Sequence, residues 1–139
     1  MTDATRQPAA RPVLTSIVPQ LFVADIKASC DFFSEKLGFA IDFTYGDPLF
    51  YAQVHRDNAR LALRHCDECV FVGDVRQRER LLSAEITVAT ADEIKQLFLS
   101  YQAEEVCLAQ TLKKEPWGAM TFIVQDLDGN LILFAGPAD

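Results

Sequence analysis

The densest cluster of reactive side chains in the sequence is the run His65-Cys66-Asp67-Glu68-Cys69. Two cysteines separated by two residues bring a pair of sulfurs close enough to bind zinc or to form a redox couple, and His65 adds a nitrogen. A structural zinc site usually takes a further ligand from a second Cys-x-x-Cys, which this sequence lacks. The run is therefore interpreted as an exposed loop, with metal or redox chemistry at Cys66, Cys69 and His65 as the alternative.

Histidines and neighbouring acids are the other candidates for catalysis. His55 and His65 have the chemistry of general bases, but no nucleophile or carboxylate pairs with either histidine at a recognisable spacing. Asp126 and Asp128 are not interpreted as a catalytic carboxylate pair, because Asp128-Gly129-Asn130 is typical of a tight hairpin turn. A structural role is expected for these residues, and no catalytic residue is identified.

Aromatic side chains surround the chain break Gly46-Asp47-Pro48. They are Phe43, Tyr45, Phe50 and Tyr51. Because successive side chains of a strand point to opposite faces, alternation divides these residues between two faces, and only some of them can line a common site. Packing in the core is the competing interpretation for each one.

Length and composition favour one globular domain. The chain has 139 residues, of which 50% are hydrophobic and 24% are charged, so it can bury a core and is unlike a disordered segment. Thirteen Lys and Arg against 20 Asp and Glu give a formal charge of −7. This balance disfavours nucleic acid and anionic membranes as partners, because like charges repel, and it suits a cationic small molecule.

No apolar run reaches the roughly 20 residues of a membrane span. Residues 1–13 contain no apolar stretch of the kind found in signal peptides and are interpreted as a flexible leader. The four cysteines, Cys30, Cys66, Cys69 and Cys107, are then expected to be thiols in a reducing compartment. The sequence predicts a cytoplasmic protein without a membrane segment.

The first half of the chain predicts one helix among four strands. Asp25 is a suitable N-cap, and Gly38 a suitable C-terminal stop, for a helix between them. The apolar stripe of this helix is Ile26, Cys30, Phe33 and Leu37. Strands are predicted at residues 16–23, 39–43, 50–55 and 61–65.

The second half repeats this order after a long connection at residues 66–81, which has room for a short helix around 74–81. Thr90 and Glu93 form a capping box at the start of a second helix. The apolar stripe of this helix is Ile94, Leu97, Phe98 and Tyr101. Strands are predicted at residues 84–88, 105–109, 119–125 and 131–134.

The predicted fold is α+β, with two βαβββ modules in a single domain that covers residues 14–139. The modules occupy about 14–65 and 82–136, joined by 66–81. Two half-sheets, each covered by a helix on one face, leave their other faces free to enclose a ligand. The doubled pattern therefore favours a central cleft for a small molecule.

Two segments carry motifs that bear on the family. Residues 21–39 read LFVADIKASCDFFSEKLGF, and the later segment contains Pro116-Trp117-Gly118, Phe122, Asp126, Asp128-Gly129-Asn130 and Phe134. Together they resemble the opening and closing modules of the vicinal oxygen chelate superfamily, which includes glyoxalase I, bleomycin resistance proteins and ring-cleaving dioxygenases. The Trp-Gly followed by Asp-x-x-Gly-Asn is most similar to the bleomycin resistance branch. The resemblance spans residues 17–136.

The resemblance implies paired βαβββ modules around a U-shaped cleft that a dimer partner often completes. Metal-dependent relatives hold a divalent ion with one His, Glu or Gln side chain from each of four strands. Carried over by position, these ligands fall at Val18, Ala62, Ser83 and Leu133, none of which is a conventional ligand. Gln20 and Glu85 lie nearby and would supply at most part of the set. No metal cofactor is therefore expected.

In the drug-binding branch a tryptophan in the setting of Trp117 stacks on planar ligand rings, whereas partial cover of a sheet edge is the structural alternative. The resemblance favours a metal-independent, homodimeric protein that sequesters an aromatic or cationic antibiotic. The predicted ligand-binding residues are Trp117, Phe43, Tyr45, Phe50, Arg64 and Phe122. The alternatives are a lyase, isomerase or dioxygenase that uses a divalent metal, and an interaction domain whose cleft is filled by its own side chains.

Overall fold

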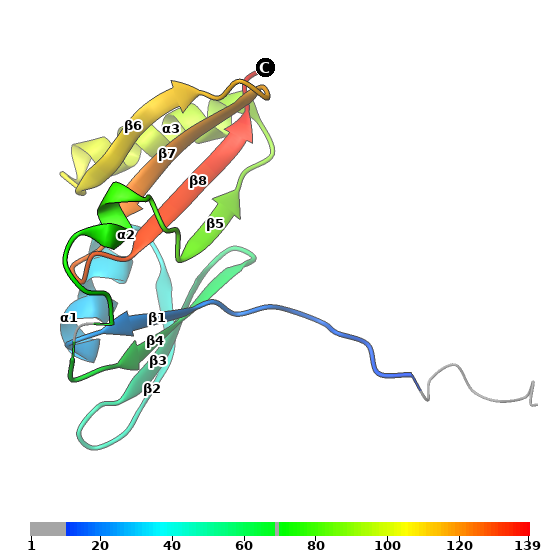
Figure 1. The fold of residues 1–139 in the computed structure, drawn as a ribbon. Helices are drawn as coiled ribbons and strands as arrows, with labels where there is room; N and C mark the ends of the chain where they lie inside the picture. The colour runs from blue at the N-terminus through cyan, green and yellow to red at the C-terminus, as the bar shows by residue number, and fades with distance from the viewer. Residues whose placement is uncertain (1–10, 69) are drawn as a thin grey trace, which may run out of the picture.

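The computed structural model describes residues 11–68 and 70–139, so most of the leader and Cys69 lie outside the described residues. Two four-stranded sheets form the body of the molecule, and each sheet has helices on one of its faces (Figure 1). The predicted α+β fold with two modules is confirmed.

The first module places its strands in the order β1-β4-β3-β2, with β1 parallel to β4 and the other pairs antiparallel. Helix α1 packs on β3 and β4. The elements are β1 (Gln20–Val23), α1 (Ile26–Asp31), the π-helical turn η2 (Phe32–Lys36), β2 (Ala40–Tyr45), β3 (Tyr51–Arg56) and β4 (Ala59–His65).

The second module repeats this topology in the order β5-β8-β7-β6, with β5 parallel to β8. The connection between the modules contains one short helix, α2 (Val75–Arg78), within the region where the sequence left room for one. The remaining elements are β5 (Ala84–Thr87), α3 (Ala91–Ala103), β6 (Leu108–Lys114), β7 (Ala119–Gln125) and β8 (Leu131–Pro137).

The predicted helix caps are present. The Asp25 side chain accepts a hydrogen bond from the Ala28 N–H at 3.0 Å, and the Thr90 hydroxyl accepts one from the Glu93 N–H at 3.1 Å. Gly38 has a φ of +79°, the left-handed conformation that glycine adopts without strain. A side chain at this position would also meet the Arg56 guanidinium, because a Cβ would lie 2.9 Å from its Nη1.

Two predicted strands have different bounds in the structure. The strand predicted at 16–23 begins only at Gln20, and the preceding residues lead away from the body as an extended arm (Figure 1). Val13, Leu14 and Ile17 on this arm are exposed. The strand predicted at 105–109 begins only at Leu108 and continues to Lys114, because α3 extends to Ala103 and the chain then turns before β6.

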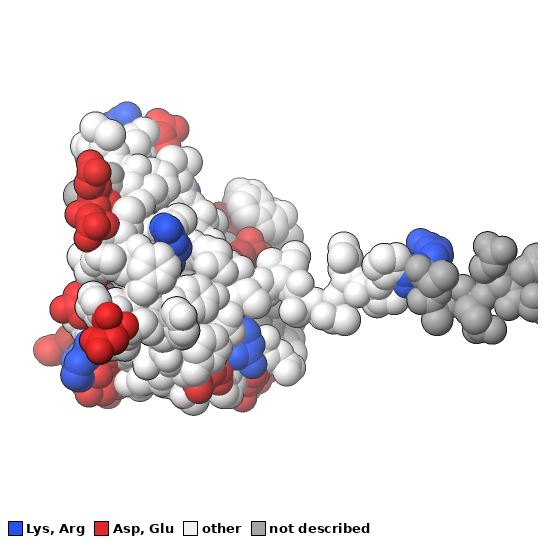
Figure 2. All heavy atoms as spheres, turned by 90° about the horizontal axis from the view of Figure 1, so that it is seen from below, with Lys and Arg blue, Asp and Glu red and all other residues white. Residues whose placement is uncertain are grey.

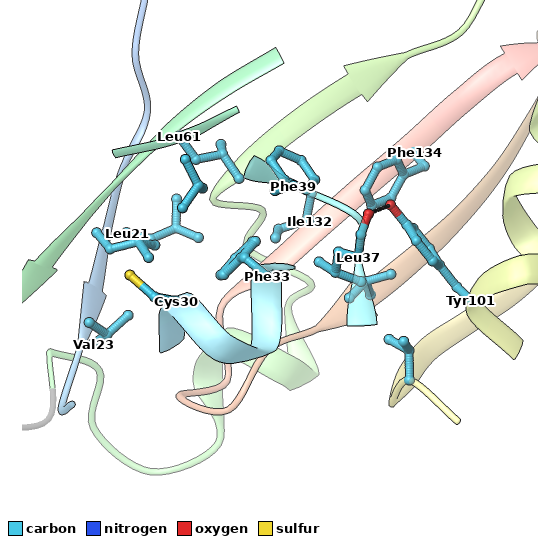
Figure 3. Packing of buried hydrophobic residues seen from close by; sticks show 14 of the residues in the cluster. Leu21, Val23, Cys30, Phe33, Leu37, Phe39, Leu61, Tyr101, Ile132 and Phe134 are labelled. Carbon is cyan, nitrogen blue, oxygen red and sulfur yellow. Dashed lines mark hydrogen bonds between the residues drawn. The ribbon is translucent and has the colours of Figure 1, made fainter. Parts of the chain in front are cut away.

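One core joins the two modules. The predicted stripes place Ile26, Cys30, Phe33 and Leu37 of the first module and Ile94 and Tyr101 of the second inside it. Phe122 and Phe134 stack at 5.2 Å between their centroids, and Tyr101 packs edge-on against both rings. Figure 3 shows Leu37, Tyr101 and Phe134 meeting where the modules touch. Burial of each such side chain stabilises the fold by about 1.5–3 kcal/mol.

A polar junction lies within this core. The carbonyl of Leu37, at the end of η2, accepts one hydrogen bond from the Tyr101 hydroxyl and another from Arg56 Nη1, each at 2.8 Å. Arg56 Nη1 also lies 3.2 Å from the Tyr101 hydroxyl oxygen. The end of a helix leaves carbonyls without helical partners, and this carbonyl is satisfied jointly by Arg56 of the first module and Tyr101 of the second. Burial raises the pKa of Tyr101 to about 12.

The turn between β7 and β8 makes a second junction. Asp126 accepts hydrogen bonds from the backbone N–H groups of Asp128 and Asn130, as the predicted structural role requires, while burial raises the pKa of its carboxyl. The Asn130 side chain then donates to the Phe22 carbonyl on β1 at 3.1 Å and accepts from Arg76 at 3.0 Å. The turn therefore ties β1, α2 and β8 together.

The described cysteines form no disulfide, and the described helices include no candidate membrane span. Cys30, Cys66 and Cys107 are free thiols, as expected for the cysteines that the structure describes. Within the described ranges, none of the helices combines the length and apolar character that a membrane crossing requires.

Tyr101→Phe is expected to reduce the free energy of unfolding by about 1–2 kcal/mol, because the Leu37 carbonyl loses its buried phenolic donor. Urea denaturation of the wild type and the variant measures this difference. Tyr45→Phe is the matched control, since Tyr45 is 70% exposed, and its loss should change stability by less than about 0.5 kcal/mol.

The stability of Tyr101→Phe should also depend on pH differently from that of the wild type. An unfolded tyrosine titrates near pH 10, whereas Tyr101 in the folded protein keeps its proton until about pH 12. The contribution of Tyr101 is therefore fully present below pH 10 and is lost as the pH rises toward 12. The stability of the wild type should fall more steeply over this window than that of Tyr101→Phe, and parallel curves would contradict the assignment.

Asn130→Ala is expected to cost about 3 kcal/mol, because the Phe22 carbonyl and the Arg76 guanidinium both lose a partner. Thermal and urea unfolding measure the effect. Asn58→Ala, in the exposed turn between β3 and β4, is the control and should cost less than about 1 kcal/mol. Equal losses in the two variants would show that the Asn130 contacts do not hold the modules together.

Candidate functional site

A β-bulge in β2 decides which side chains lie together on the first sheet. Ile41 pairs with Val54 and Phe43 pairs with Gln53, so Asp42 is one extra residue between them. Because an extra residue reverses the alternation, Ile41 shares the face of buried Val54 and Phe43 shares the opposite face. Regular alternation along the strand predicted at 39–43 would place Ile41 and Phe43 on one face, and the bulge separates them instead.

The strand register brings aromatic residues from neighbouring strands to one face. Tyr45 on β2 lies opposite Tyr51 on β3, Tyr51 lies opposite Arg64 on β4, and Arg64 lies opposite Phe22 on β1. The rings of Phe43 and Tyr51 are 6.0 Å apart between centroids. We call this surface the aromatic face and define it by Phe22, Phe43, Tyr45, Phe50, Tyr51 and Arg64.

The aromatic face is open in the isolated chain. Helix α1 covers the other side of the sheet, where it packs on β3 and β4. The exposed fractions of Phe43, Tyr45 and Phe50 are 46%, 70% and 43%. The structure thus brings together four of the six predicted ligand-binding residues, with Arg64 as the fourth, and adds Phe22 and Tyr51 to them.

Polar residues continue this face toward the turn between β3 and β4. His55 lies opposite Arg60, and Asp42 at the bulge contacts both side chains. The Asp42 carboxylate is 2.5 Å from His55 Nδ1 and also pairs with Arg60. Sequence spacing indicated no carboxylate partner for His55, because the bulge and the register, not the distance along the chain, bring Asp42 to it.

Trp117 and Phe122 lie elsewhere. Trp117 is 74% exposed in the turn between β6 and β7, at the far end of the molecule from the turn between β2 and β3 (Figure 1). The interpretation of Trp117 as cover for a sheet edge is not supported by this exposure. Phe122 is fully buried against Phe98, Tyr101 and Phe134, so it is a core residue and the prediction that it contacts a ligand is corrected.

The side chains of His65 and Cys66 form hydrogen bonds with Ala24 and with the loop that follows β4. His65 Nδ1 lies 2.9 Å from the Ala24 carbonyl and Nε2 lies 2.7 Å from the Asp67 carboxylate, so both ring nitrogens have partners. The Cys66 thiol donates to the Glu68 carbonyl at 3.2 Å. These contacts agree with the interpretation as a loop, and the role of Cys69 lies outside the described residues.

A cleft of about 800 Å³ lies where the modules meet. It is lined by the turn between β3 and β4, by β5, by the first half of α3 and by Ile17 of the arm. Acids predominate among its charged groups, including Asp57, Glu85 and Asp92. The predicted ligand-binding residues do not line this cleft, which opens beside the aromatic face at Arg60.

The donor set does not fit the divalent metal centre of the metal-dependent relatives. Gln20 on β1 lies opposite Ala62 on β4, and Glu85 on β5 lies opposite Leu133 on β8. Each of these two strand pairs therefore offers one oxygen donor and one apolar side chain, whereas the metal centre takes a ligand from every strand. Ser83 is hydrogen-bonded to Asn130. Among the residues that the structure describes, His, Cys, Asp and Glu side chains form no group of three that could hold a metal ion.

Comparison with protein families gives a match over nearly the whole chain. The family model of the Glyoxalase/Bleomycin resistance protein/Dioxygenase superfamily matches residues 14–134. No curated protein matches the sequence.

Solved structures of similar fold include a bleomycin-binding protein from bleomycin-producing Streptomyces verticillus, complexed with copper(II)-bleomycin. It is 25% identical, with a TM-score of 0.66 over 89% of this chain and 97% of that one. TioX from Micromonospora sp. ML1 is 20% identical, with a TM-score of 0.66 over 88% and 98% of the two chains. A superfamily protein from Alicyclobacillus acidocaldarius is 18% identical, with a TM-score of 0.69 over 88% and 92%.

Proposed function

The chain belongs to the glyoxalase/bleomycin resistance protein/dioxygenase superfamily, and on that premise we propose that it is a metal-independent, cytoplasmic protein that binds a planar aromatic small molecule without transforming it. The aromatic face is the binding surface. The observation that carries this proposal is the register of the first sheet, which places Phe43 and Tyr45 of β2 on the same face as Tyr51 of β3 and Phe22 of β1.

The exposure of these rings supports a binding role. A soluble monomer rarely exposes a large contiguous apolar patch unless the patch is used. Phe43, Tyr45 and Phe50 are all more than 40% exposed, and their rings offer flat apolar surfaces. Each ring that stacks on a ligand contributes about 0.5–1.5 kcal/mol beyond the area it buries, so two rings add about 1–3 kcal/mol to the burial of the ligand.

The similarity to the Streptomyces verticillus protein supports the same class of function. That protein binds bleomycin, and its sequence is 25% identical over 89% of this chain. In this chain the rings of the aromatic face present a flat apolar surface, which suits the planar rings of an aromatic ligand.

We further propose that two copies share each site. Trp117 lies far from the aromatic face of its own chain, so it reaches such a face only on a second copy (Figure 1). An exposed tryptophan on a turn that ends in Gly118, with a φ of +96°, is free to close over a ligand held by the partner's rings. A homodimer of this kind would complete two identical sites related by a twofold axis.

The binding proposal predicts a saturable signal with planar compounds. Bleomycin and neutral naphthamide should raise the melting temperature, and bleomycin should quench Trp117, the only tryptophan. Phe43→Ala should weaken binding about tenfold, because one stacked ring contributes about 1–1.5 kcal/mol. Leu99→Ala, which removes an exposed apolar side chain from α3, is the control and should leave affinity unchanged.

Mixing two variants tests the shared site. Trp117→Ala and Phe43→Ala should each bind poorly alone, whereas an equilibrated mixture should regain intact sites in the heterodimers, which hold one wild-type pair of residues. Sedimentation establishes the dimer in the same samples. Failure of the mixture to recover binding would show that each chain builds its site alone.

Metal independence predicts substoichiometric zinc, nickel, manganese and iron in protein purified without chelators, and ligand affinity that does not change in EDTA. A stoichiometric metal that persists in the Cys66→Ser, Cys69→Ser double variant would favour a metal-dependent lyase, isomerase or dioxygenase. A metal lost in that variant would assign it to the Cys-x-x-Cys loop.

A further inference from the structure

Arg64 is the charged group at the centre of the aromatic face. Its guanidinium carbon lies 5.1 Å from the centroid of the Phe50 ring and 5.9 Å from that of Phe22, and both contacts place the cation over a ring. Arg64 also lies opposite Tyr51 in the sheet. A cation held over aromatic rings is stabilised electrostatically, which limits the conformations of an otherwise flexible side chain.

Among the residues that the structure describes, the positive charge of Arg64 has no protein counterion. In residues 11–68 and 70–139, no carboxylate forms an ion pair or hydrogen bond with its guanidinium. Asp42, on the polar continuation of this face, is already paired with Arg60 and His55. The contacts of Arg64 with Phe22 and Phe50 are cation–π contacts, which leave its N–H donors without an acid to bind.

The local charge of the face is therefore opposite to the charge of the whole chain. The protein carries a formal charge of −7, yet the aromatic face centres on an unpaired arginine. Figure 2 shows the underside of the molecule, where acidic groups gather mainly on the side opposite the N-terminal arm and single basic groups lie among uncharged atoms. A bound ligand responds most strongly to the charge it touches, because salt screens charges beyond about 10 Å.

We propose that Arg64 makes the aromatic face selective for planar aromatic anions, namely flat rings that carry a carboxylate or a sulfonate. The ring of such a ligand stacks on Phe43, Tyr45 and Tyr51, and its acid group accepts two parallel hydrogen bonds from Arg64. This inference rests on the proposed binding function and names the ligand class for the same face. It replaces the cationic ligand that the net charge favours.

The test compares three ligands of one shape: naphthoate, neutral naphthamide and naphthylmethylammonium. Titration calorimetry or ligand-observed NMR at physiological ionic strength measures each affinity. Naphthoate should bind the wild type about tenfold more tightly than the other two, as expected for one charge-assisted, bidentate contact. Arg64→Gln should remove this preference, so that the ratio of the affinities for naphthoate and naphthamide falls from about tenfold to about one.

Two further variants exclude simpler explanations. Arg78→Gln removes the same charge from exposed α2, where Arg78 pairs with Asp74, and it should keep the full preference for naphthoate. Arg64→Lys keeps the charge but not the planar fork, so it should retain part of the preference. If Arg64→Gln were to unfold, as judged by circular dichroism, Arg64→Lys would serve as the test in its place.

The outcomes separate this inference from the proposed function. Binding of all three ligands with equal affinity, or tighter binding of the ammonium compound, would overturn selectivity for anions while binding at the aromatic face stood. If Arg78→Gln also lost the preference for naphthoate, the preference would come from the net charge of the protein and not from Arg64. Absence of binding by all three ligands would overturn both proposals, and sedimentation of Phe43→Ala would then show whether a second copy covers the face.

Discussion

The structure depends on backbone carbonyls of the first module that accept hydrogen bonds from side chains of the second. The carbonyl of Leu37, at the end of a helix, receives the buried hydroxyl of Tyr101 together with Arg56 of its own module. The carbonyl of Phe22 receives the side-chain amide of Asn130. Loss of a buried donor costs about as much as a lost hydrogen bond, so these contacts stabilise the packing of one module on the other. The sheet that carries the aromatic face is therefore positioned by residues more than 60 positions away in the sequence.

Local patterns were sufficient to predict most of the fold. Asp25 and Thr90 cap the helices at the expected positions, and the apolar stripes of both helices contribute to the core, because caps and helical spacing act within a few residues. The repeated order of elements then predicted two modules. The ends of the strands were less predictable: residues 16–19 have the composition of a strand, but strand formation also needs a neighbouring strand.

The site was predictable only in part, for a reason that Asp42 illustrates. Whether Ile41 and Phe43 lie on the same side of the sheet depends on one extra residue in β2, and alternation in the sequence does not reveal it. The contact of Asp42 with His55 and the position of Arg64 between Phe22 and Phe50 also follow from the register of four strands. For Phe122 the sequence suggested a contact that the structure does not support. Its place in a family motif suggested a ligand contact, whereas packing against α3 makes it part of the core.

The bulge also bears on how such a surface arises and disappears. Deletion of Asp42 would remove only the extra residue, because Ile41 would stay opposite Val54 and Phe43 would stay opposite Gln53. Deletion of Thr44 would instead bring Phe43 opposite Ala52, on the side of α1, and separate it from Tyr51. The position of a one-residue gap within a single strand therefore decides whether a lineage keeps or loses this surface.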